Sequence, residues 1–162
     1  AYVDMRRPMA KFSFVTTDID EFMARVLAVD AAEASSRAVI LDDYYVVLRY
    51  HGFMPSSFNM FSDKPNDSRV GVSFQSSIRN MGDGEAELGF DYVFANVDEA
   101  VIAVSVELYD STDKLLSASK AVDIPIVRSK LTVVRGRFLT EDASGGVAID
   151  PGYDGEYNYR ID

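Results

Sequence analysis

The chain has no cysteine, which excludes disulfides, thiolate nucleophiles and cysteine-ligated zinc. It has one histidine, His51, so a site with several histidine ligands is excluded as well. A Ser/His/Asp triad would have to be built around His51, and no G-x-S-x-G or equivalent nucleophile motif lies beside it. We therefore expect a protein that is not an enzyme and binds no cofactor, with His51 as a turn residue that has one ring nitrogen hydrogen-bonded.

Positive charge is also scarce. The chain has 16 Lys and Arg against 26 Asp and Glu, a formal net charge of -10. The summed field repels phosphate backbones and anionic headgroups at long range, so nucleic acid is not an expected partner. No run of about 18 apolar residues occurs, and the sequence as given therefore predicts no membrane-spanning helix.

What the chain does have is apolar alternation with period 2, which is typical of half-buried strands. Turn residues separate these segments, and the spacing predicts an all-β fold: an antiparallel Greek-key β-sandwich of about seven or eight strands. We expect residues 1–162 to form a single domain, with "SDKPNDS" at 62–68 as its longest linker-like stretch. The expected strands are 9–15, 44–50, 69–78, 87–96, 100–110, 114–124, 130–140 and 157–161.

A helical period appears once, in "TTDIDEFMARVLAVDAAEA" at 16–34. Thr17 or Asp18 is the expected N-cap, two acids follow in the first turn, and an apolar stripe begins at Ile19. These signals predict one short helix near residues 18–28, lying across a sheet edge.

Four cations lie within ten positions, and two interpretations of them stay open. A bend or bulge at Gly136 would turn the last two outward. Cations that alternate on a sheet face are usually solvated, protect an edge and pair with nearby acids. The alternative is a dedicated anion site. The four residues are Arg128, Lys130, Arg135 and Arg137.

Two further groups of residues are weak candidates for binding sites. Asp150, Asp154 and Glu156 supply hard oxygen ligands of the kind that calcium prefers, but their spacing does not match an EF-hand loop. Two tight turns explain that segment as well, so we expect no metal. The tyrosines either form a sugar-stacking platform or fill half-buried strand positions. They are Tyr44, Tyr45, Tyr50, Tyr92, Tyr109, Tyr153, Tyr157 and Tyr159.

Six stretches, in order along nearly the whole chain, carry a resemblance to a known family. The sequence resembles a domain of unknown function in surface lipoproteins of the Bacteroidetes, which is related to type V fimbrial subunits and described as a cell adhesion protein. The stretches are "RRPMAKFSFVTTD", "GFMPSSFN", "PNDSRVGVSF", "LGFDYVFAN", "VDIPIVRSKLTVVRGRFLT" and "SGGVAIDPGYDGEYN".

The resemblance implies a transthyretin-like or immunoglobulin-like sandwich at the outer membrane, facing outward from the cell surface. It also implies a lipid anchor on a cysteine upstream of these residues, which would be the sole membrane contact. A further sandwich domain would precede this one, making the chain the C-terminal domain of a two-domain lipoprotein. In such bacteria the stretch Asp110-Ser111-Thr112 fits a short O-glycosylation pattern at Ser111.

The function implied is that of a non-enzymatic fimbrial or adhesion-type subunit, with protein or glycan as partner. Related subunits are assembled by strand addition at an open sheet edge. The candidate edges are the first strand, Met9 to Val15, and the last, Glu156 to Ile161. The alternative is a glycan-binding or nutrient-capture domain of a surface lipoprotein.

Overall fold

The structure is a computed structural model that describes residues 7–32, 40–140 and 156–160. Within these residues the chain is mostly β, with one α-helix and one short 3-10 helix, so the expected all-β class is confirmed. The elements are β1 (Met9–Thr16), α1 (Ile19–Ala32), η1 (Leu41–Asp43), β2 (Tyr44–His51), β3 (Met54–Asn59), β4 (Lys64–Arg69), β5 (Ser73–Ser77), β6 (Arg79–Gly82), β7 (Glu85–Phe94), β8 (Ala100–Asp110), β9 (Leu115–Ala118), β10 (Val122–Ile126), β11 (Leu131–Gly136) and β12 (Glu156–Arg160).

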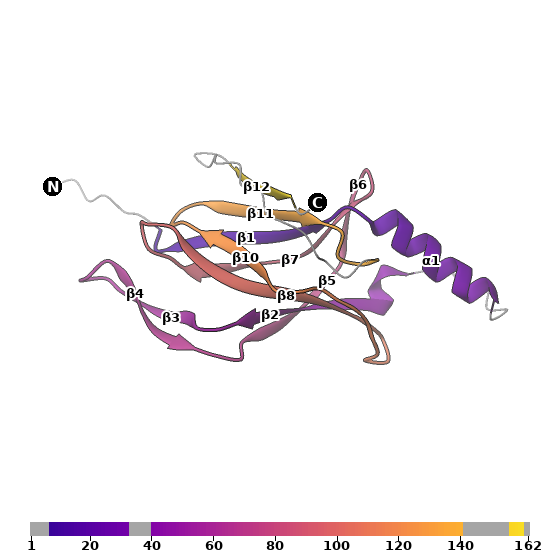
Figure 1. Ribbon diagram of the computed structural model, residues 1–162, viewed down its shortest axis with the longest axis horizontal. Helices are drawn as coiled ribbons and strands as arrows, with labels where there is room; N and C mark the ends of the chain where they lie inside the picture. The colour runs from indigo at the N-terminus through magenta and orange to yellow at the C-terminus, as the bar shows by residue number, and fades with distance from the viewer. Residues whose placement is uncertain (1–6, 33–39, 141–155, 161–162) are drawn as a thin grey trace.

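The strands form two larger sheets and one separate hairpin. The first sheet has the order β12-β11-β1-β7-β6, and the second has the order β10-β8-β2-β5, with β9 also paired to β8. Strands β3 and β4 pair with each other. Figure 1 shows the two sheets as layers, with the β3–β4 hairpin at the end where β1 begins and α1 at the opposite end.

One buried core lies between the two sheets. Phe12 and Phe14 of β1, Leu48 of β2 and Val104 of β8 are all fully buried in it. The rings of Phe12 and Phe14 meet edge to face with centroids 6.0 Å apart, and Phe14 meets Phe138 in the same way at 5.4 Å. Each such side chain contributes about 1.5–3 kcal/mol on burial. The apolar alternation therefore determines which face of each strand points inward.

The expectation that all strands are antiparallel is wrong. Strand β11 runs parallel to β1, and β12 runs parallel to β11. Strand β1 also pairs antiparallel with β7 on its other side, so it is the middle strand of its sheet. The first strand is therefore not an open edge, whereas β12 ends the strand order as expected. Alternation could not reveal this, because side chains alternate in the same way in both strand directions.

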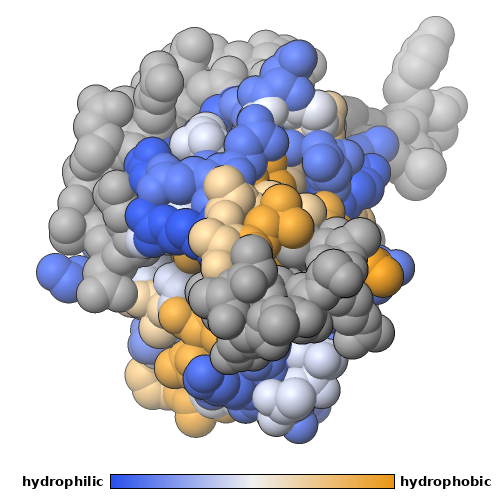
Figure 2. Space-filling view, turned by 90° about the vertical axis from the view of Figure 1, so that its right-hand side faces the viewer, coloured by the Kyte–Doolittle hydropathy of each residue, from blue (hydrophilic) through white to orange (hydrophobic). Residues whose placement is uncertain are grey.

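The predicted helix is present and is longer than expected, ending at Ala32. Ile19 and Phe22 are buried, and the Phe22 ring meets Tyr44 edge to face at 5.2 Å. Beyond this first turn Leu27 is 48% exposed, and Figure 1 shows α1 extending away from the end of the sheets rather than lying across an edge. In the view from that end, hydrophobic residues gather in patches among hydrophilic ones (Figure 2).

A buried carboxylate forms the corner between β1 and α1. The backbone N–H of Phe22 donates to the carbonyl of Asp18 at 3.0 Å, so the helix begins at the expected residue. The Asp18 side chain accepts hydrogen bonds from the Thr140 N–H at 2.9 Å, the Thr140 hydroxyl at 2.6 Å and the Thr16 hydroxyl. A buried carboxyl group is costly unless hydrogen bonds satisfy its oxygens. Asp18 therefore joins the end of β1 to the segment that follows β11.

The stretch 62–68, expected to be a linker, is instead part of the β3–β4 hairpin. The two strands pair antiparallel, with Asn59 opposite Lys64. The Asn59 side chain accepts hydrogen bonds from the N–H groups of Phe61 and Ser62, at 2.9 and 3.2 Å, and these bonds close the turn. Five of the six residues of β4 are exposed, so no apolar alternation marks this strand.

Two predicted strands are each divided in the structure. Residues 69–78 contain only the end of β4 and the whole of β5. Residues 114–124 divide into β9 and β10, and Ser119 between them pairs with Val106 of β8. Its N–H donates to the Val106 carbonyl at 2.8 Å, and its hydroxyl oxygen accepts from the Val106 N–H at 2.9 Å. The break thus lets β9 and β10 both pair with the long strand β8.

The close approach of the two sheets at Gly89 generates a prediction. This residue of β7 has φ of +154°, and an added Cβ would lie 2.9 Å from Ser76 Oγ and 3.0 Å from Leu48 Cδ1. We expect Gly89→Ala to lower the free energy of unfolding by about 2–4 kcal/mol, because backbone strain and overpacking act together. Urea denaturation monitored by circular dichroism measures this change.

Gly71→Ala is the matched control, because Gly71 has φ of +68° but no atom within 4 Å of the added Cβ. It should lower the free energy of unfolding by about 1–2 kcal/mol, from backbone strain alone. Equal losses in the two variants would contradict the close approach of the sheets at Gly89.

Candidate functional site

The four cations of residues 128–137 lie in different environments. We expected a bend or bulge at Gly136. Strand β11 instead ends at this residue, and its pairing with β1 has no bulge. Arg135 has its Nε 3.8 Å from Glu85 Oε1, and Arg137 donates from Nη2 to Glu21 Oε2 at 2.6 Å. The hydrogen bond from Arg137 is the main cause of a lowered pKa at Glu21. These two arginines therefore pair with acids, in the way expected of cations on a strand.

Arg128 has a different role, because it is buried in the loop between β10 and β11. Its Nη1 donates to both carboxylate oxygens of Asp63 at 2.8 Å, and its Nη2 donates to the Asp63 carbonyl at 2.7 Å. Its Nε donates to the Ala95 carbonyl at 3.3 Å, and the guanidinium lies 5.0 Å from the ring centroid of Phe58. Arg128 thus anchors the turn of the β3–β4 hairpin to the end of β7.

The anchored hairpin presents an apolar tip. Met60 is 79% exposed and Phe61 is fully exposed at the turn, and Phe53 before β3 is 77% exposed. The hairpin is held a second time beside its turn by Phe58 of β3, whose ring stacks on that of Phe94 of β7 with the centroids 6.0 Å apart. Adjacent exposed apolar side chains on a well-anchored element are typical of an interaction site.

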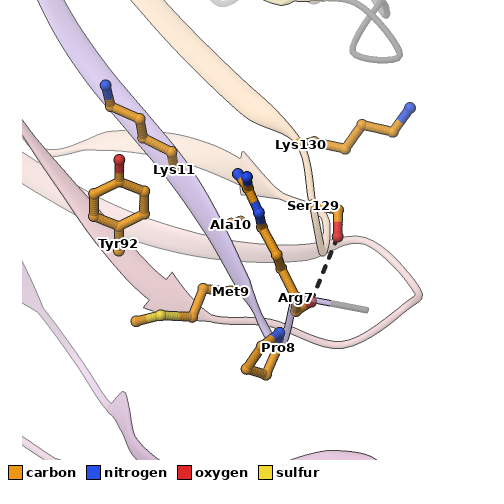
Figure 3. A pocket seen from close by; sticks show the side chains of 8 residues that line it. All are labelled: Arg7, Pro8, Met9, Ala10, Lys11, Tyr92, Ser129 and Lys130. Atoms are coloured by element: carbon orange, nitrogen blue, oxygen red, sulfur yellow. Dashed lines mark hydrogen bonds between the residues drawn. The ribbon is translucent and has the colours of Figure 1, made fainter. Parts of the chain in front are cut away.

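A pocket of about 400 Å³ lies where β1 begins, and Lys130 is part of it. Three of the eight lining residues are cations and none is acidic, although the whole chain has a net charge of -10. In Figure 3 the Arg7 side chain lies between those of Lys11 and Lys130. The lining residues are Arg7, Pro8, Met9, Ala10, Lys11, Tyr92, Ser129 and Lys130.

Backbone hydrogen bonds fix the walls of this basic pocket. The N–H of Ser129 donates to the Met9 carbonyl, and the N–H of Lys11 donates to the Lys130 carbonyl, both at 2.9 Å. The Ser129 hydroxyl also donates to the Arg7 carbonyl at 3.4 Å (Figure 3). The loop after β10 is therefore bound along the start of β1, and the cations from the two segments face one pocket.

The comparisons with known proteins place the chain in a family but give it no function. The profile of a family of unknown function (DUF6562) matches residues 1–162. The chain belongs to this family. No curated protein matches the chain, and no solved structure matches it. The functional argument for this DUF6562 member therefore depends on its own residues.

His51 is at the end of β2, and its Nε2 lies 2.8 Å from the hydroxyl oxygen of Ser105 in β8. One ring nitrogen is thus hydrogen-bonded, as expected, although the residue is in a strand rather than a turn. Ser105 is only 5% exposed. Among the described residues no carboxylate hydrogen-bonds to His51, so this Ser–His pair is not part of a triad there.

The described tyrosines do not form one platform. Tyr45 and Tyr109 stack at 5.3 Å on adjacent strands, Tyr44 packs on the helix, and Tyr92 lines the basic pocket. Tyr50 is buried and donates to Asp91 Oδ2 at 2.6 Å; burial and this hydrogen bond raise its pKa. Tyr153 and the side chains of Tyr157 and Tyr159 lie outside the described residues.

The remaining candidates are placed only in part. Ser111 is exposed in the β8–β9 turn, which Asp110 closes by accepting from the Thr112 N–H at 2.8 Å. Its glycosylation stays a prediction. Asp150, Asp154 and the side chain of Glu156 lie outside the described residues. Within the described part of the chain, no group of three or more acidic or histidine side chains has the geometry to hold a metal ion.

Sequence reasoning missed Asp63, Arg7 and Lys11. Asp63 lies in the stretch expected to be a linker, where its backbone has a left-handed φ of 55°, and nothing in that stretch indicated a buried partner for its carboxylate. Arg7 and Lys11 line the same pocket as Lys130 because β1 pairs with β11. Period-2 alternation does not specify which strands become neighbours, so no signal in one sequence joins these residues.

The Arg128 anchor generates a prediction. We expect Arg128→Met to lower the free energy of unfolding by about 2–4 kcal/mol, because several buried hydrogen bonds are lost together. Urea denaturation measures the loss. Hydrogen exchange should also show that Arg128→Met speeds up exchange of the backbone amides in the β3–β4 hairpin more than exchange of those in β8.

Arg79→Met removes the same charge from an arginine whose side chain is 69% exposed, and its partner Glu87 keeps the hydrogen bond from the Ser13 hydroxyl. This control should change the free energy of unfolding by about 1 kcal/mol or less. If both variants lose the same stability, or hairpin exchange is unchanged in Arg128→Met, Arg128 does not anchor the hairpin.

Proposed function

We propose that the domain is a non-enzymatic, adhesion-type subunit of the cell surface that contacts a protein partner through the tip of its β3–β4 hairpin. The observation that carries this proposal is the combination of two exposed apolar residues, Met60 and Phe61, with the buried Arg128 anchor behind them. Preorganised apolar contacts avoid the entropy that a mobile loop loses on binding. A rigid tip of this kind suits insertion into an apolar pocket on another protein.

The finer features of the proposal come from the resemblance. They are a transthyretin-like or immunoglobulin-like Greek-key sandwich, export to the outer membrane, and a lipid anchor upstream of these residues. Two stacked sheets with one core are compatible with such a sandwich. No described helix is both long enough and apolar enough to cross a bilayer.

Immunogold electron microscopy with an antibody against this domain tests the location, with a gene-deletion strain as control. Gold along thin filaments, or at their ends, supports a fimbrial subunit and separates stalk from tip or base. Diffuse gold on the envelope, with filaments unlabelled, supports a stand-alone adhesion lipoprotein instead. Gold confined to the cell interior would contradict both forms of the proposal.

Photocrosslinking tests the hairpin tip itself. With p-benzoyl-phenylalanine in place of Phe61, illumination of producing cells should give a discrete adduct, detected by immunoblot and mass spectrometry. The same group in place of Leu116, which is 40% exposed on β9, is the matched control. Equal adducts at both positions, or none at position 61, would count against the tip as the contact site.

The fimbrial form of the proposal also predicts assembly through a sheet edge. The strands β5, β6, β10 and β12 end the two strand orders, and an added strand would complete their backbone hydrogen bonds. We expect the purified chain to form larger species as its concentration rises, as measured by sedimentation velocity. A chain that stays monomeric at high concentration and adds no peptide would exclude this mode of assembly.

A further inference from the structure

The cations of the basic pocket differ from most other cations of the fold in their surroundings. Six arginines in the described residues form ion pairs with carboxylates: Arg25, Arg49, Arg79, Arg128, Arg135 and Arg137. Within the same described part of the chain, Arg7, Lys11 and Lys130 form none, although they line one pocket. Like charges that line one pocket, with no acid among the lining residues, repel one another. An anionic ligand would relieve this repulsion.

Lys11 is held in place by aromatic rings rather than by an acid. Its Nζ lies 4.2 Å from the ring centroid of Phe90 and 5.8 Å from that of Tyr92. An ammonium over a ring face keeps its charge and its hydrogen-bond donors available. Because the pocket walls are also joined by backbone hydrogen bonds, the site is organised before any ligand arrives.

The pocket combines these cations with apolar surface. Met9 and Tyr92 line one side, and the Tyr92 residue is 50% exposed. Phe90 beside it is 44% exposed. A tyrosine presents an apolar ring and a polar hydroxyl to the same ligand. A small inorganic anion would use the cations alone, whereas a sugar with acidic groups would use both surfaces.

We propose that this pocket binds an acidic saccharide, a sugar that carries carboxylate or sulfate groups. Arg7, Lys11 and Lys130 bind the anionic groups, and the Tyr92 ring packs against the C–H face of the sugar. The volume of about 400 Å³ lies within the range of small-molecule sites. This site is separate from the hairpin tip, and the inference does not depend on the adhesion role.

Isothermal titration calorimetry on the 162-residue chain tests the inference with four probes. Tri-galacturonic acid supplies carboxylates, and a sulfated carrageenan oligosaccharide supplies sulfates. Neutral galactotriose and a hexa-glutamate peptide are the comparisons. We expect saturable binding of at least one acidic saccharide that weakens as salt is added, and no binding of galactotriose. The acidic probe that binds more tightly identifies the anionic group that the pocket accepts.

Variants locate the binding. Arg7→Ala, Lys11→Ala and Lys130→Ala should each weaken it about three- to tenfold. Tyr92→Leu should weaken it about threefold without changing its salt dependence, because it removes the ring but no charge. Lys114→Ala is the matched control: it removes one positive charge in the β8–β9 turn, at the far end of β8, and should leave affinity unchanged.

Three results would overturn the inference. The first is that neither acidic saccharide binds. The second is that hexa-glutamate binds as tightly as the saccharides, which would mean that the pocket recognises charge alone. The third is that Lys114→Ala weakens binding as much as the pocket variants, which would assign the effect to net charge. A failed crosslink at position 61 would leave all of these outcomes unaffected, so the two proposals fail separately.

Discussion

The arrangement at one end of the molecule depends on a single buried guanidinium. Arg128 binds the hairpin turn through Asp63 and the end of β7 through Ala95. A buried charge is stabilising only when its donors are satisfied, and here one partner is a carboxylate and two are backbone carbonyls. Two apolar contacts also join β3 to the sheets: Phe58 stacks on Phe94, and Met54 at the start of the strand is buried in the core. Arg128 is the polar anchor that holds the turn itself.

The same loop also builds the basic pocket, because Ser129 and Lys130 follow Arg128 directly. The Arg128 N–H donates to the Asn96 carbonyl at 3.1 Å, and the Ser129 N–H donates to the Met9 carbonyl at 2.9 Å. One short segment thus connects β7, the start of β1 and the hairpin. The hairpin turn and the start of β1, which lines the pocket, lie at the same end of the molecule (Figure 1), and this loop contacts both of them.

Strand alternation predicted the parts of the fold in which one face is buried. Strand β8 matches its predicted range, and α1 begins where Asp18 and the acids after it indicated. The hairpin was missed because most of β4 is exposed, so no buried face imposes a pattern on it. The parallel pairing of β1 with β11 was missed for a different reason. Pairing is a long-range property, and the alternation in each strand is compatible with several neighbours.

Some residues of the candidate site could be predicted from the sequence, but their arrangement could not. The cations at 128–137 stood out in an acidic chain, and the sequence left open whether they are solvated cations of a strand or a dedicated anion site. The structure separates them into a buried anchor, two acid-paired arginines and one pocket lysine. What separates them is the end of β10 and the turn at Arg128, where the chain leaves one sheet and enters the other. Burial of Arg128 needs a carboxylate from the distant hairpin, and the pocket needs cations from β1. Charge pattern along a chain therefore indicates that cations have a role, whereas only the pairing of distant strands determines which role each one takes.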